Sequence, residues 1–88
     1  MSQELEKEVV RRLRNAQGHL AGLERMVETG QDCAAVLHQL AAVRAALDKI
    51  SELVLEGYMA ECLAKSREQD TTVLDVRDLV RLLHRFLR

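Results

Sequence analysis

Residues 36–54 read VLHQLAAVRAALDKISELV, and this stretch decides the fold class. Its large apolar residues recur at alternating spacings of four and three: Val36, Leu40, Val43, Leu47, Ile50 and Val54. An α-helix has about 3.6 residues per turn, so this spacing lines one face of a helix with apolar side chains. The pattern predicts a long helix from Cys33 to about residue 66.

The segment before this helix carries the same kind of pattern. Spacings of three and four join Leu5, Val9, Leu13, Ala16, Leu20, Leu23 and Val27. They predict a first helix over about residues 3–29. Gly30 suits the left-handed residue that follows a helix, and Asp32 is a favoured N-cap for the next one. The two long helices are therefore expected to run antiparallel.

A third, shorter helix is expected over about residues 72–87, after a polar break from Arg67 to Thr72. Gly57 lies inside the second helix, where it costs about 1 kcal/mol relative to Ala. It either weakens that helix or marks a close packing point. Residues 1–88 are thus predicted to form a single all-α domain of three helices.

The composition excludes other classes of protein. The 88 residues include no Pro, four Gly, one Tyr and one Phe, which is too little turn-forming and β-forming material for a sandwich, a barrel or an α/β domain. No apolar stretch reaches the roughly 18 residues of a membrane span, and the charged start of the chain does not resemble a secretory signal. We expect a cytoplasmic protein. The net charge of −1 means that any DNA-binding surface must be local.

The apolar stripes are too wide for one hairpin to bury, because each helix would still expose about half of its apolar face. We expect a second copy to cover that half. The product would be an antiparallel four-helix-bundle dimer, with the third helix available to pack one dimer on another.

Cys33 and Cys62 are the two cysteines, 29 residues apart. On one helix a rise of about 1.5 Å per residue separates them by about 44 Å, so they cannot meet within a chain. If two copies of the second helix run antiparallel about an axis near Leu47 and Asp48, Cys33 of one chain approaches Cys62 of the other. The alternative is that both are small core residues.

Few other residues offer site chemistry. Two thiolates suit a soft ion such as Cu(I), but one turn before Cys62 stands Tyr58, whose phenol is a poor ligand for it. The histidines show no metal-ligand spacing and are expected at a surface or an interface: His19, His38 and His84. No catalytic triad pattern or phosphate-binding Gly loop is visible, so we expect no enzyme.

Basic residues cluster at Arg11, Arg12 and Arg14 of the first helix, and Arg44 and Lys49 punctuate the second. One interpretation is a solvated face with helical ion pairs such as Glu8 with Arg12. The other is a phosphate-contacting patch, repeated by the symmetry of an oligomer, that binds DNA.

Three blocks of sequence resemble one family. They are RLRNAQGHLAGLERM at residues 12–26, Asp32-Cys33, and VLHQLAAVRAAL at residues 36–47. They are similar to the copper-sensing operon repressors, a family of bacterial transcriptional regulators, and the resemblance spans about Glu8 to Leu87. It implies an all-helical homotetramer, a dimer of dimers, that leaves operator DNA when an inducer binds. Arg12 and Lys49 fall at the family's DNA-contacting positions, with Arg14 beside them.

The sensory position of that family reads His-x-x-x-Cys, with a further Cys from the other protomer. Cys62 and Cys33 match the two thiols, but Tyr58 replaces the His. The branch that retains both thiols without the His senses persulfides, and this sequence resembles it. We therefore predict a repressor, without a resident cofactor, that persulfide or polysulfide releases from DNA. The alternatives are a Cu(I)-sensing repressor using the same thiols, and a helical carrier of sulfur or metal that does not bind DNA.

Overall fold

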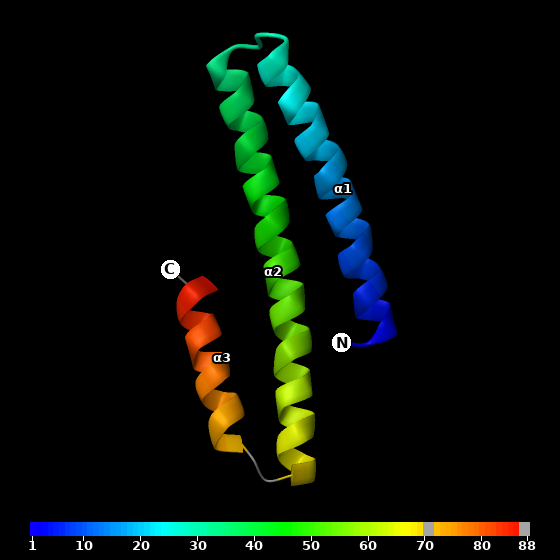
Figure 1. The fold of residues 1–88 in the computed structure, drawn as a ribbon, viewed down its shortest axis with the longest axis vertical. Helices are drawn as coiled ribbons and strands as arrows, with labels where there is room; N and C mark the ends of the chain where they lie inside the picture. Colours follow the sequence, from blue (N-terminus) through cyan, green and yellow to red (C-terminus); the bar gives the residue numbers. More distant parts are fainter. Residues whose placement is uncertain (70–71, 87–88) are drawn as a thin grey trace.

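The computed structural model describes residues 1–69 and 72–86, which form three helices and no strand. They are α1 (Gln3–Glu28), α2 (Cys33–Gln69) and α3 (Thr72–Phe86). α1 and α2 lie side by side as an antiparallel hairpin, and α3 returns along the second half of α2 on the side away from α1 (Figure 1). The predicted all-α protomer is confirmed.

The helix bounds follow the sequence prediction except at the end of α2. That helix continues to Gln69, so the expected polar break was wrong over Arg67 to Gln69. Lys, Arg, Glu and Gln are all good helix formers, and a polar segment without Gly or Pro therefore does not end a helix. The predicted end of the third helix at residue 87 lies outside the described residues.

The hairpin turn is built by the two residues that predict it. Gly30 has φ +77°, and its N–H donates to the Val27 carbonyl at 3.2 Å. The Gln31 N–H donates to the Met26 carbonyl at 2.9 Å, which completes a Schellman motif. Asp32 then caps α2, because its Oδ1 accepts the Ala35 N–H at 2.7 Å. Both predicted caps are confirmed.

The apolar residues of the two helices form two rows, and within each row successive residues of one helix are seven positions apart. One row is buried in the hairpin: Val9, Ala16 and Leu23 of α1, with Val43 and Ile50 of α2. The other row is exposed, and we call it the outer stripe: Leu13, Leu20 and Val27 of α1, with Leu40, Leu47 and Val54 of α2. The hairpin thus leaves about half of its large apolar side chains uncovered, as predicted.

Gly57 marks a close packing point, and α2 runs through it unbroken. A Cβ at Gly57 would lie 2.8 Å from Leu5 Cδ2, whereas a Cβ at Gly18 would meet no atom within 4 Å. Gly18→Ala should therefore raise the free energy of unfolding by about 0.5–1 kcal/mol. Gly57→Ala should raise it by less, or lower it, because Leu5 must move.

Urea unfolding of both variants at one protein concentration checks this pair of expectations. Equal gains from Gly18→Ala and Gly57→Ala would contradict the close contact between Leu5 and α2.

Candidate functional site

The two thiols lie at opposite ends of one face of α2. Cys33 is the first residue of the helix and is exposed, and Cys62 is half-buried. Their separation of 29 residues is about eight helical turns, so both side chains leave the helix in nearly the same direction. Both are free thiols, which agrees with the prediction that they do not pair within a chain.

That face of α2 also carries the outer stripe. Leu40 follows Cys33 by seven residues, and Leu47 follows it by fourteen, which is two and four helical turns. Leu40 and Leu47 are both exposed. The two thiols and these leucines therefore share one face of α2. We call the surface of the outer stripe with Cys33 and Cys62 the thiol face.

Tyr58 lies one turn before Cys62 and is half-buried. The start of α1 packs beside this segment: Leu5 contacts α2 at Gly57, and the Met1 amine forms an ion pair with Glu61. The surroundings of Cys62 are therefore in contact with the first turns of α1.

Arg12 is half-buried and forms part of a three-residue ion-pair cluster. Glu8 Oε1 accepts from Arg12 Nε at 2.8 Å and from Arg11 Nη2 at 2.7 Å. The hydrogen bond from Arg11, which has the larger effect, and the one from Arg12 lower the pKa of Glu8 below its usual value. The Glu8 carboxylate in turn raises the pKa of Arg11. The expected Glu8–Arg12 pair is present, and Arg11 shares the carboxylate.

A hollow with a volume of about 170 Å³ opens between α1 and α2 beside Arg12. We call it the basic hollow, and its lining residues are Arg11, Arg12, Asn15, Ala16, His19 and Ala46. His19 is half-buried, and its Nε2 lies 2.6 Å from Gln39 Oε1, which joins the two helices at one end of the hollow.

The basic hollow and the thiol face lie on opposite sides of the hairpin. Neighbouring residues of a helix point about 100° apart. On α1, Arg12 and His19 therefore lie on one side of the buried row, and Leu13 and Leu20 lie on the other side. On α2, Ala46 and Leu47 flank Val43 and Ile50 in the same way.

Lys49 is exposed on α2, one turn after Ala46, and its Nζ lies 3.5 Å from Glu52 Oε2. This spacing puts Lys49 on the side of α2 that carries Ala46. The structure thus places two of the predicted DNA-contacting residues, Arg12 and Lys49, on the side of the hairpin opposite the cysteines.

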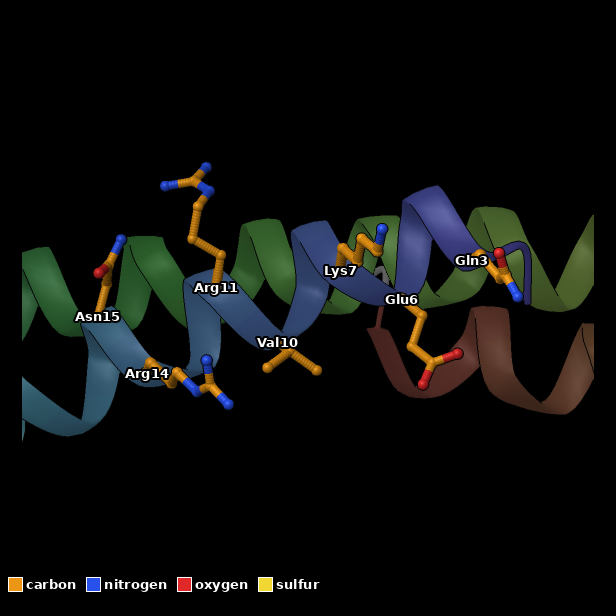
Figure 2. Close-up of a pocket in the computed structure, with 7 residues that line it drawn as sticks. All are labelled: Gln3, Glu6, Lys7, Val10, Arg11, Arg14 and Asn15. Atoms are coloured by element: carbon orange, nitrogen blue, oxygen red, sulfur yellow. The ribbon is translucent and has the colours of Figure 1, made fainter.

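Arg14 lies apart from this pair. It lines a larger, open hollow of about 820 Å³ on the outer surface of α1, together with Gln3, Glu6, Lys7, Val10, Arg11 and Asn15. In Figure 2, Arg14 and Arg11 extend to opposite sides of α1. Arg11 and Asn15 line both hollows, so these two residues lie on the boundary between the basic hollow and the outer surface of α1.

Sequence reasoning did not identify Asn15, His19 and Ala46 as parts of a basic surface. The available signal was helical spacing: Asn15 and His19 follow Arg12 by three and seven residues, and so share its side of α1. The approach of Ala46 depends on how α2 docks, which no local pattern gives.

The sequence model of the metal-sensitive transcriptional repressor family matches residues 5–85. An uncharacterized protein of the bioA 5′ region in Serratia marcescens is 42% identical over 71 residues, covering 74% of this chain and 78% of that protein. The copper-sensing transcriptional repressor CsoR of Mycobacterium ulcerans is 34% identical over 67 residues, covering 73% of this chain and 57% of that protein.

Solved structures agree with the sequence comparisons. The nickel-responsive transcriptional regulator InrS superposes with a TM-score of 0.82 at 36% identity, covering 98% of this chain and 97% of that one. The copper-sensing repressor CsoR with Cu(I) from Geobacillus thermodenitrificans superposes with a TM-score of 0.88 at 26% identity, covering 100% of this chain and 92% of that one. The chain belongs to the metal-sensitive transcriptional repressor family and is not an enzyme.

Two further findings concern the described part of the chain. None of its helices is long and apolar enough to cross a membrane. Among the same residues, no three side chains of His, Cys, Asp or Glu within one protomer are grouped as a metal site would require.

Proposed function

We propose that this repressor senses reactive sulfur, and that a Cys33–Cys62 bridge between two protomers is the signal that releases it from DNA. The observation that carries the proposal is the thiol face: two free thiols on one side of α2, with Tyr58 in place of a third soft donor. Phenol oxygen is a poor ligand for soft metals, whereas sulfur exchange needs only the two thiols.

The outer stripe supports the assembly that the proposal needs. Six large apolar side chains are exposed in rows of heptad spacing, which is the pattern that helices of a bundle bury against one another. A second copy placed antiparallel about Leu47 would cover the outer stripe on both α1 and α2. The same operation brings Cys33 of each protomer to Cys62 of its partner. We propose this dimer, and a dimer of dimers with α3 at the second interface, as the DNA-binding form.

The sulfur chemistry balances without a metal. A Cys33 thiolate attacks the sulfane sulfur of a persulfide RSSH; a new S–S bond forms, and the thiolate RS⁻ leaves. Cys62 of the other protomer then attacks the Cys33 sulfur of Cys33–S–SH, and HS⁻ leaves. The persulfide is the oxidant, since its sulfane sulfur ends as sulfide while two thiols become one disulfide. We propose Cys33 as the first thiol to react because it is the more exposed of the two in the protomer.

The test is intact mass of the reduced protein after anaerobic treatment with a persulfide donor, with DNA binding measured on the same sample. We expect a covalent dimer, bridged by a disulfide or a longer sulfur chain, that no longer binds DNA. Unchanged mass and unchanged DNA binding would overturn the sulfur-sensing proposal.

Copper sensing is the second candidate, because a copper-sensing repressor and a Cu(I)-bound structure are among the relatives. Cys33 and Cys62 of two protomers would hold Cu(I), and Tyr58 would be a bystander. Nickel favours imidazole donors, and none of the histidines lies within four residues of either cysteine. Stoichiometric Cu(I) binding that releases DNA, with no effect of persulfide, would make the copper assignment correct.

Arg12→Ala should weaken DNA binding without unfolding the assembly. Arg12 borders the basic hollow, and losing one phosphate contact should reduce the slope of log K against log salt by about one. Fluorescence anisotropy across a salt series measures both quantities, and Arg25→Ala, in the last turn of α1, is the matched control. Unchanged affinity at moderate salt would argue against this surface.

A further inference from the structure

The basic hollow has a size and a chemistry that differ from those of a small-molecule site. Its volume of about 170 Å³ is well below the roughly 300–1,000 Å³ of typical ligand pockets. It can hold one small group with its water. The polar lining side chains are two guanidiniums, an amide and an imidazole, and no carboxylate lines it.

Glu8 orients both guanidiniums in the absence of a ligand. Glu8 accepts from Arg12 Nε and from Arg11 Nε and Nη2, which limits the rotamers of both side chains. Each guanidinium has five N–H donors, so both retain donors for a second acceptor. A planar guanidinium with N–H groups on several edges is well suited to phosphate oxygens.

The other walls keep the hollow open and give it a defined width. His19 contacts Gln39 across the helix pair at one end of the hollow. Ala46 contributes only a methyl group from α2. A side chain as large as Leu at position 46 would extend into the hollow. Asn15 also lines the hollow and is exposed.

The hollow also stays accessible in the dimer proposed above. It opens on the side of the hairpin opposite the outer stripe, so a second copy seated on Leu47 does not cover it. Lys49 lies on the same side, which extends the positive charge along the helices.

From these observations we propose that the basic hollow seats one phosphodiester phosphate of the DNA backbone. Arg11, Arg12 and Asn15 donate to its oxygens, and the small Ala46 is the residue that makes room for it. This inference rests on the proposed repressor function and adds Asn15 and Ala46 to its DNA surface. Because the ligand is a backbone phosphate, the seat contributes affinity and orientation rather than sequence choice.

Ala46→Leu tests the seat by filling it without changing any charge. Ala46→Ser is the matched control, because Ser leaves the hollow open. The probes are two labelled duplexes of equal length: one from the region upstream of the chain's own gene, and one of scrambled sequence. We expect Ala46→Leu to weaken binding about tenfold on both duplexes, which is the size of a lost charge-assisted hydrogen bond. Ala46→Ser should stay within about twofold of the unsubstituted chain.

Asn15→Ala provides a second variant, because Asn15 is exposed and its loss does not disturb the core. Its affinity should fall on both duplexes while the salt slope stays the same, since a neutral donor releases no counterion. Circular dichroism and the solution mass confirm that each variant keeps its fold and assembly.

The outcomes separate the seat from the proposed function. If the unsubstituted chain binds neither duplex, the repressor surface itself is wrong. If it binds and Ala46→Leu binds equally well, or loses affinity for the upstream duplex alone, the phosphate seat is wrong. Inorganic phosphate is then compared with chloride at equal ionic strength. If Ala46→Leu keeps the DNA affinity of the unsubstituted chain but is no longer released from DNA by phosphate, the hollow binds free phosphate and the DNA assignment is overturned.

Discussion

Cys33→Ala is expected to give a repressor that binds DNA as the unsubstituted chain does but is no longer released by persulfide. Cys33 lies on the thiol face, whereas Arg12 and Lys49 lie on the other side of the hairpin, so removing the thiol leaves the DNA surface in place. The sulfur atom that begins the exchange is then absent. Persulfide treatment should form no covalent dimer, and the concentration of persulfide needed to release DNA should rise at least a hundredfold.

Cys62→Ala should be measured beside Cys33→Ala, because the two variants stop the sulfur exchange at different steps. Cys33 can still take up one sulfur atom, but no thiol remains to displace sulfide and close the bridge. Intact mass should show a protomer heavier by one sulfur and no covalent dimer. An inducible Cys33→Ala protein would sink the sulfur-sensing model, and bridging in Cys62→Ala would show that the pairing of the two thiols is wrong.

Leu47→Glu should have the second large effect, which is loss of the assembly. Leu47 is exposed at the middle of the outer stripe, close to the proposed twofold axis. Two copies of the variant would bring two carboxylates together in an apolar contact, and burying such unpaired charges costs several kcal/mol. The dimer dissociation constant should rise at least a hundredfold, and DNA binding should be lost with it.

Sedimentation velocity across a dilution series measures this change. Leu47→Met is the control, because it keeps the volume and the apolar character of the side chain and should assemble normally. A Leu47→Glu protein that sediments as the unsubstituted assembly would show that the outer stripe faces something other than a second copy.

The sequence predicted the helices well because their signals are local. The spacing of apolar residues located α1 and α2, and Gly30 and Asp32 located the turn between them. The end of α2 was missed because the residues up to Gln69 are polar but helix-forming. Polarity reports exposure to water, and it does not by itself report the end of a helix.

The division of each stripe into a buried and an exposed row could not be read from the residues. Val43 and Leu47 are both large and apolar, and only the docking angle of α1 decides that Val43 is buried and Leu47 exposed. The same holds for the basic residues. Arg12 and Arg14 are neighbours in sequence, but α1 turns them to different surfaces, and only Arg12 borders the basic hollow.

The shallow core of the hairpin has a thermodynamic consequence. The described residues include five buried apolar side chains, and none of the large ones falls below 2% exposure. A second copy that covers the outer stripe would supply much of the remaining burial, which couples folding to association. By mass action the melting temperature should then climb as the protein is concentrated. A cell holding few copies of this repressor would keep it nearer to its unfolding threshold than a concentrated sample suggests.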